Sequence, residues 1–232
     1  MRDVDIPVVR NLPLFAGMDD SRFSQLVGAA LLQNFPAQVD LLTEGEPADF
    51  LYILVEGAVE MYARHDGRET TMAIIEPPAA FILAAVLSDA VCLMSARTLY
   101  PSRLLMIPNE HIRACFADDR NFASAVVVEL SKAYRQLVKK HKDNKLRLAA
   151  ERLANYIIRQ SLKQPDPKNY ILPADKKTVA ALLSMTPENL SRAFGAISNH
   201  GVRVRGPNIH IDDLDKLTAF AKPSDLIDGP ED

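Results

Sequence analysis

The sequence has few cysteines and no long hydrophobic run. Cys92 and Cys115 are its only two cysteines, and no CxxC pair or cysteine–histidine cluster occurs. Two thiols are too few for a disulfide framework, a four-cysteine zinc site or a four-cysteine iron–sulfur cluster within one chain. The longest apolar run, Ala79 to Leu87, has nine residues, whereas a membrane-spanning helix needs about 20. We therefore expect no membrane span and no cluster of the iron–sulfur type.

Targeting and catalytic signals are also absent from the sequence. The N-terminus begins with the acidic residues Asp3 and Asp5 and has neither a basic n-region nor an apolar h-region, so we expect no signal peptide and a cytoplasmic location. No GxSxG, HExxH, P-loop or dinucleotide fingerprint occurs, which makes an enzyme the weakest functional class. The 232 residues are 48% hydrophobic and 25% charged, values typical of one or two globular domains.

Positive charge is scarce in the first half of the chain. Residues 1–120 contain no lysine and 9 arginines against 17 acidic residues, whereas residues 121–232 contain 18 basic and 13 acidic residues. The overall charge of −3 therefore averages an acidic part and a basic part. A basic C-terminal part suggests a polyanionic partner, although charge alone more often marks a solvated surface.

The N-terminal half has the pattern of a small antiparallel β-structure. Apolar spacing predicts short helices between Leu14 and Leu32. Strand-like runs follow at Leu51–Tyr62, Thr70–Ile75, Ala96–Tyr100 and Leu104–Ile107. Asp66-Gly67 is a strong hairpin signal, and Gly57 within a strand run indicates a bulge or a close backbone approach. Short strands separated by turns predict an antiparallel barrel or jelly roll, here called the β-roll.

A long helical segment follows Asp118. Apolar and large side chains recur at alternating steps of four and three residues: Ala123, Val127, Leu130, Tyr134, Leu137, His141 and Asn144. This spacing is that of a coiled-coil seam and also suits a helix packed on its own domain. The flanking lysines and arginines leave little other apolar surface, which favours a dimer through Val127, Leu130, Tyr134 and Leu137. A further amphipathic helix is expected at Leu148–Leu162, with the domain boundary near Asp143–Leu146.

Residues 175–197 have the pattern of a helix-turn-helix. Asp175 is placed to cap one helix, which runs through Leu183, and Thr186 with Pro187 is a strong start signal for a second. On the second helix Glu188, Ser191 and Arg192 share one face, whereas Leu190, Phe194 and Ile197 share another. A polar face at the start of a second helix is how such motifs read the DNA major groove.

A hairpin pattern follows the two helices. Residues 202–211 alternate in polarity around Gly206-Pro207, so that Arg203 and Arg205 fall on one side. These arginines are suited to hold DNA phosphates as a wing. A lone two-helix pattern is most often a structural hairpin of helices, but the basic charge, Arg192 and the wing together favour DNA binding.

The chain resembles the CRP/FNR family of bacterial transcription regulators over nearly its whole length. The matching features are Asn11-Leu-Pro-Leu-Phe15, Glu44-Gly45-Glu-Pro-Ala-Asp49, Leu54-Val-Glu-Gly57 and Thr186-Pro-Glu-Asn-Leu-Ser-Arg192. The E-x-x-S-R pattern of Glu188, Ser191 and Arg192 is similar to the FNR branch rather than the cyclic-AMP receptor branch.

The resemblance implies an α+β fold in three parts. These are an effector-sensing β-roll of the cyclic-nucleotide-binding type (residues 1–118), a dimerisation helix (119–144) and a winged helix-turn-helix domain (145–232). It further implies a homodimer that binds double-stranded DNA at TTGAT-type half-sites and works with RNA polymerase. The DNA-binding residues would be Thr186, Glu188, Asn189, Ser191, Arg192, Arg203 and Arg205, with Arg192 contacting guanine.

The sequence departs from the cyclic-nucleotide-binding members. Their phosphate cassette has Gly-Glu after Phe and a later Arg-Ser pair, whereas here Phe81 is followed by Ile82-Leu83, and Ala90-Val91 stands at the later place. A nucleotide phosphate buried without those charges would be unpaired, at a cost of several kcal/mol. Cyclic AMP is therefore not the expected effector. FNR carries N-terminal cysteines for an oxygen-sensing cluster, and this chain has none before Cys92.

The remaining resemblance is to the denitrification-regulator (DNR/NnrR) subgroup, which implies haem-bound nitric oxide as an effector. The expected effector pocket is apolar and comprises Ile82, Leu83, Val86, Val91, Leu93 and Met94. Such residues suit haem or another hydrophobic effector, and they equally suit a pocket collapsed into core. Five histidines (His65, His111, His141, His200 and His210) offer axial ligands without a distinctive motif. The alternative function is a ligand-binding β-roll that regulates a protein partner, with a structural helix-turn-helix.

Overall fold

The computed structural model describes residues 5–172 and 174–229, apart from the side chain of Asp5. The chain forms two compact units, one ending at Ser131 and the other beginning at Lys132. Helix α6 (Arg120–Leu146) runs from the first unit into the second. The predicted dimerisation helix, residues 119–144, corresponds to this helix within two residues at either end.

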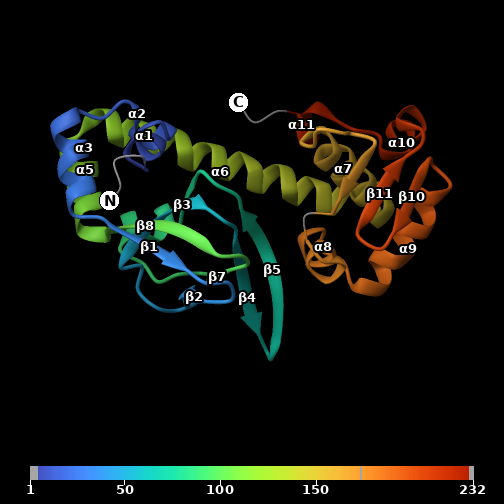
Figure 1. Cartoon of the computed structure of the whole chain (residues 1–232), viewed down its shortest axis with the longest axis horizontal. Coiled ribbons are helices and arrows are strands. Elements are labelled where there is room, and N and C mark those ends of the chain that lie inside the picture. The colour runs from blue at the N-terminus through green and yellow to red at the C-terminus, as the bar shows by residue number, and fades with distance from the viewer. Residues whose placement is uncertain (1–4, 173, 230–232) are drawn as a thin grey trace. The chain divides into compact units, whose positions relative to one another are not determined.

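The first unit contains two four-stranded antiparallel sheets (Figure 1). One has the strand order β1-β8-β3-β6 and the other β2-β7-β4-β5. The strands are β1 (Leu31–Phe35), β2 (Asp40–Leu42), β3 (Phe50–Glu56), β4 (Val59–His65), β5 (Arg68–Ile75), β6 (Ala79–Phe81), β7 (Ser95–Thr98) and β8 (Ser102–Pro108). This arrangement confirms the expected antiparallel β-roll.

Helices precede the strands of this unit, interrupt them once and follow them along the chain. They are α1 (Asp5–Arg10), α2 (Pro13–Ala16), α3 (Asp20–Gly28), α4 (Leu83–Ser88) and α5 (Asn109–Asp118). The expected short helices between Leu14 and Leu32 are present as α2 and α3, but the chain is already in strand β1 at Leu31. Pairing of β1 with β8 overrides the local spacing there. Helix α4 was not predicted from the sequence.

Two turn predictions are confirmed by the backbone. Asp66 and Gly67 have φ values of 54° and 73° between paired residues His65 and Arg68, as a type I′ hairpin requires. Gly57 has φ +96°, and a Cβ there would lie 2.2 Å from the Ser102 Oγ. The expected close approach at Gly57 is therefore real.

The first unit has two apolar clusters. One, here called the helical cluster, lies between the helices and strands β3 and β8 and includes Phe15 and Phe122, whose rings stack at 5.9 Å. The other lies between the sheets and includes Tyr52 and Phe81, whose rings stack at 5.4 Å. Aromatic side chains therefore occupy the interior of the β-roll.

The second unit is a helical domain with a three-stranded sheet of order β10-β11-β9 (Figure 1). Its elements are α7 (Ala149–Leu162), β9 (Asn169–Ile171), α8 (Lys176–Leu182), α9 (Pro187–Ser198), β10 (Val202–Arg205), β11 (Asn208–Ile211), α10 (Leu214–Ala221) and α11 (Asp225–Asp228). One cluster of buried side chains from α7, α8, α9, α10 and the sheet forms its core. The expected helix-turn-helix and wing are both present.

The start of this unit is fixed by buried ion pairs. The Arg147 guanidinium donates to Asp143 Oδ1 at 2.9 Å and to both carboxylate oxygens of Asp228, and Arg159 Nη1 donates to Asp228 Oδ1 at 2.7 Å. The Arg147 side chain is only 6% exposed. These contacts connect α11 to the end of α6, to the residues between α6 and α7, and to the last turn of α7.

Candidate nucleic-acid interface

The two helices of the helix-turn-helix are capped as the sequence predicts. The Asp175 carboxylate accepts a hydrogen bond of 2.7 Å from the Thr178 amide at the start of α8. Thr186 Oγ1 accepts one of 3.3 Å from the Asn189 amide, and Pro187 is the first residue of α9. Each cap satisfies an amide that the helix itself leaves unpaired. Local sequence therefore sets where α9 begins and which residues lie in its first turns.

The buried face of α9 decides which face remains exposed. Leu190, Ala193, Phe194 and Ile197 are buried in the core of the second unit. The exposed face carries Glu188, Ser191 and Arg192, the same three residues that the sequence placed together. A carboxylate, a hydroxyl and a guanidinium are thus presented over the first two turns of the helix. These groups can accept from cytosine, bond to any base, and donate twice to guanine, respectively.

Contacts at the start of α9 orient Arg192 and keep Glu188 ionised. The Arg192 guanidinium donates to Asn189 Oδ1, one turn earlier on the helix. Hydrogen bonds from the Thr186 hydroxyl and from its own amide hold the pKa of Glu188 below its usual value. Glu188 is therefore an ionised acceptor at neutral pH, and Arg192 is a guanidinium with one end held by an amide oxygen.

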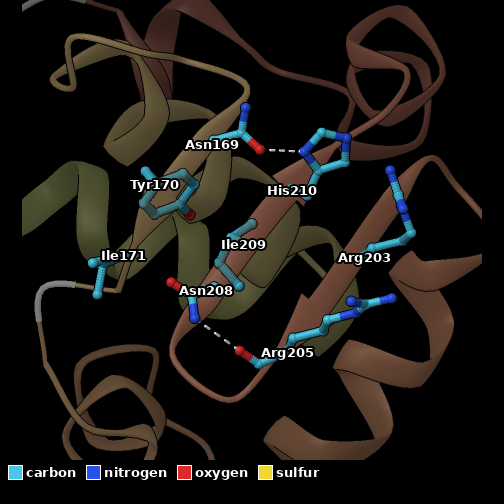
Figure 2. Close-up of a pocket in the computed structure, with 8 residues that line it drawn as sticks. All are labelled: Asn169, Tyr170, Ile171, Arg203, Arg205, Asn208, Ile209 and His210. Atoms are coloured by element: carbon cyan, nitrogen blue, oxygen red, sulfur yellow. Dashed lines mark hydrogen bonds between the residues drawn. The ribbon is translucent and has the colours of Figure 1, made fainter.

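The wing sheet has one buried and one exposed face. Val202, Ile209 and Ile211 are buried, whereas Arg203 and Arg205 lie on the exposed face. Figure 2 shows these arginines beside Asn208 and His210 of the neighbouring strand. Asn169, Tyr170, Ile171 and Ile209 complete the lining of a hollow of about 380 Å³. The expected position of both arginines on one side of the hairpin is confirmed.

The two wing arginines differ in their partners. Arg203 Nε donates to Asp212 Oδ2 at 2.6 Å, and Arg203 Nη2 donates to the other oxygen of the same carboxylate. No ion pair involves Arg205 within residues 5–172 and 174–229. Sequence reasoning treated the two as equivalent phosphate ligands and missed Asp212. The signal was present, because Asp212 directly follows a strand that pairs with Arg203 in the hairpin register.

The six residues of the expected effector pocket do not line one cavity. Val86 is fully buried in the helical cluster, Leu83 packs against that cluster, and Ile82 packs against both apolar clusters. Met94 packs against the other cluster, between the sheets. Val91 and Leu93 are 47% and 79% exposed. Helix α4 contributes to this division, because it turns Val86 inward, and in the connection that follows it Val91 and Leu93 are exposed on either side of the buried Cys92.

This placement does not suit haem. A haem pocket needs apolar side chains that converge on one enclosed space, and here the interior of the β-roll contains the stacked Tyr52 and Phe81 rings. Among the described residues, no group of three or more His, Cys, Asp or Glu side chains is placed to hold a metal ion.

No described helix is both long and apolar enough to cross a membrane.

The expected seam of α6 divides into exposed and packed positions. Val127, Tyr134 and Leu137 are 59%, 68% and 65% exposed. Leu130 is half-buried and packs against the helical cluster of the first unit. One position of the seam therefore packs on its own unit, and three are exposed.

Comparison with known proteins identifies both units. Residues 32–119 match the cyclic nucleotide-binding domain family, and residues 151–220 match the Crp-like helix-turn-helix domain family. A CRP-like cAMP-activated global transcriptional regulator of Mycobacterium tuberculosis is 22% identical over 215 residues, which are 90% of this chain and 96% of that protein.

Solved structures share the fold at low sequence identity. FixK2 from Bradyrhizobium japonicum is 19% identical with a TM-score of 0.71, covering 84% of this chain and 98% of that one. DNR from Pseudomonas aeruginosa is 23% identical with a TM-score of 0.53, covering 95% of this chain and 99% of that one. Identities this low show a common fold alone.

Proposed function

Because this chain belongs to the CRP/FNR family of DNA-binding transcription regulators, we propose that it acts as a homodimer on two-fold sites of TTGAT-type half-sites. The observation that carries the proposal is the exposed face of α9, where Glu188, Ser191 and Arg192 stand free of the core. A helix of this kind enters the major groove with its first turns against base edges. Arg192 would contact guanine O6 and N7, with Glu188 and Ser191 at neighbouring base pairs.

Asn189 has a supporting part in this proposal. Its side-chain oxygen already holds one end of the Arg192 guanidinium, which restricts the rotamers of the arginine before DNA is bound. A restricted arginine loses less conformational entropy on binding than a free one. Thr186 contributes as the N-cap, because its hydroxyl accepts a hydrogen bond from the Asn189 amide and so fixes where α9 begins.

The proposed dimer uses the exposed positions of α6. Val127, Tyr134 and Leu137 recur at helical spacing with more than half of each side chain exposed. A second copy of the same helix would cover them and would bring two copies of α9 to a two-fold DNA site. RNA polymerase is the further partner that we propose from the resemblance.

We propose that the effector is not a cyclic nucleotide and that the chain is of the denitrification-regulator type. Leu83 and Ala90 stand where the resemblance would require charged partners for the sugar and the phosphate. Neither side chain offers a hydrogen bond to a charged group. The placement of the six apolar residues does not support haem as the effector.

The proposal is tested by exchanging Arg192 for alanine. Wild type and Arg192→Ala are titrated with a two-fold TTGAT probe and with a probe in which the guanine is replaced. Loss of a bidentate contact should cost about 1 to 3 kcal/mol per half-site and remove the preference for guanine. Lys216→Ala is the charge-matched control, since Lys216 is an exposed cation on a different helix, α10.

Two outcomes contradict the proposal in different ways. If Arg192→Ala discriminates the probes as well as wild type does, α9 does not read the base through this arginine. If the purified wild type binds no TTGAT probe, the alternative is favoured, in which the β-roll regulates a protein partner and the helix-turn-helix is structural.

A further inference from the structure

The Arg203 guanidinium in the wing is already occupied. Its Nε and Nη2 groups donate to the two carboxylate oxygens of Asp212, the first at 2.6 Å. Two parallel hydrogen bonds to two oxygens are also the geometry in which arginine binds a phosphate. Asp212 therefore takes the place on Arg203 that a DNA phosphate would take.

Several contacts fix the position of the Asp212 carboxylate. The Asp212 amide donates to the Gly201 carbonyl at 2.8 Å. His210 Nε2 lies 2.9 Å from Asp212 Oδ1, and the other ring nitrogen of His210 contacts Asn169 Oδ1 (Figure 2). The backbone and a neighbouring side chain thus hold the carboxylate beside Arg203.

Arg205 provides the contrast on the same strand. It lies two residues further along β10, on the same exposed face, beside the turn of the hairpin (Figure 2). In the part of the chain that the structure describes, no carboxylate is paired with it. One wing arginine is therefore free to meet a phosphate at once, and the other must first leave its carboxylate.

We propose that Asp212 competes with DNA phosphates for Arg203 and thereby weakens binding to DNA of arbitrary sequence. This rests on the proposed DNA-binding function. The Arg203 and Asp212 side chains are 59% and 41% exposed, so their pair is weak enough to exchange. At the correct site, base contacts of α9 hold the wing against the DNA backbone. This favours the exchange in which Arg203 leaves Asp212 and binds a phosphate. On other DNA those contacts are missing, and Arg203 stays with Asp212.

The inference makes Asp212 a determinant of specificity without any contact to a base. Contacts to phosphate add affinity for every sequence and therefore raise nonspecific binding. Restraining one such contact lowers nonspecific binding more than binding to the correct site. The ratio of the two affinities, which decides occupancy among many competing sites, increases as a result.

The test compares Asp212→Asn, Arg203→Ala and the double variant, each as the full chain. Dissociation constants are measured for a two-fold TTGAT probe and for a scrambled probe over a range of salt concentrations. Asp215→Asn is the matched control, because it removes the same charge from an exposed position in the first turn of α10. Circular dichroism confirms that each variant is folded.

Asp212→Asn should bind the scrambled probe about two- to fivefold more tightly than wild type, the range expected when an exposed ion pair is lost. Its plot of log affinity against log salt should be steeper by about 0.9 for each phosphate gained. The TTGAT probe should gain less, so the specificity ratio falls. Arg203→Ala alone should change the scrambled-probe slope little, whereas Arg205→Ala should flatten it by about 0.9 per protomer.

The double variant separates a specific effect from a general one. If Asp212→Asn still tightens binding when Arg203 is absent, or if Asp215→Asn gives the same gain, charge alone is responsible and the inference is wrong. An unchanged specificity ratio in Asp212→Asn, with wild type preferring TTGAT, overturns this inference and leaves the proposed function intact. A wild type with no preference for TTGAT overturns both.

Discussion

The Asp228 carboxylate is the acceptor at the centre of the ion pairs in the second unit. It accepts two hydrogen bonds from Arg147, one of 2.7 Å from Arg159 Nη1 and one of 2.8 Å from the Ser224 amide. The Asp228→Ala substitution removes all four. Arg147 then keeps only Asp143, at 2.9 Å, and a long contact to the Lys222 carbonyl.

The cost follows from how little of this arginine is exposed. The side chains of Arg147 and Asp228 are 6% and 11% exposed, so water does not replace the lost acceptor freely. Removing one partner of a buried pair costs about 3 to 5 kcal/mol. Because Asp143 still compensates part of the charge, we expect a smaller loss than this, about 2 to 3 kcal/mol. For a unit of about 100 residues this corresponds to a melting temperature lower by about 10 to 20 °C.

The assay must assign the loss to the second unit. Calorimetric unfolding of the full chain gives the size of the effect, and native-state hydrogen exchange locates it. Amides of α7 should exchange faster in Asp228→Ala, whereas amides of β3 in the first unit should be unchanged. Asp225→Ala, at an exposed position in the same short helix, should cost less than about 0.5 kcal/mol.

A melting temperature within about 3 °C of wild type would refute the reasoning, since it would mean that the pair of Arg147 and Asp228 is not formed or not desolvated.

The stabilisation by Asp228 also has a defined pH dependence. Burial raises the pKa of Asp228, but hydrogen bonds from Arg147 and the Ser224 amide hold it below the ordinary value. The stabilisation is therefore present above the unfolded carboxyl pKa of about 3.9 and is lost as the pH falls through the folded pKa. The difference between wild type and Asp228→Ala should narrow on acidification below about pH 4.

Three further predictions follow from the first unit and α6. Gly57→Ala should lose about 1 to 3 kcal/mol in denaturant unfolding, because the new Cβ would lie 2.2 Å from Ser102 Oγ at φ +96°, whereas Gly28→Ala, with nothing within 4 Å, should be neutral or stabilising. Leu137→Glu should dissociate the dimer without unfolding the chain, as measured by light scattering. A monomeric wild type at micromolar concentration would contradict the proposed seam. Leu130 is a poorer site for this test because it packs on its own unit. Millimolar cyclic AMP or cyclic GMP should give no saturable heat in calorimetry, and clear saturation with either would overturn the argument from the missing charged partners.

Sequence alone was sufficient for the helix-turn-helix and the hairpins. The caps at Asp175 and Thr186, the first-turn Pro187 and the Asp66-Gly67 turn were all located correctly. Each is a short-range signal, because the side chain and the amide that it caps, or the two residues of the turn, lie within three positions of each other. The exposed face of α9 follows for the same reason, since helical spacing alone separates Leu190 from Arg192.

Other features depended on contacts between distant segments. The sequence placed six apolar residues in one pocket, but helix α4 buries Val86 and leaves Leu93 at the surface. It placed Leu130 on the seam with Val127, but the helical cluster of the first unit partly covers Leu130. Apolar spacing identifies which residues seek burial and does not identify the surface that buries them, which only the packed structure decides.

Ion pairs show most clearly which features the sequence determined and which depended on tertiary contacts. The alternation along residues 202–211 placed Arg203 and Arg205 together on one side of their hairpin. Tertiary structure decided that Arg147 meets Asp228, since the two are 81 positions apart. The pair of Arg203 and Asp212 was within reach of the sequence, because the hairpin register of β10 and β11 brings the two close together. An ion pair depends on the distance between two side chains in space, and chain spacing fixes that distance only within a helix turn or a hairpin.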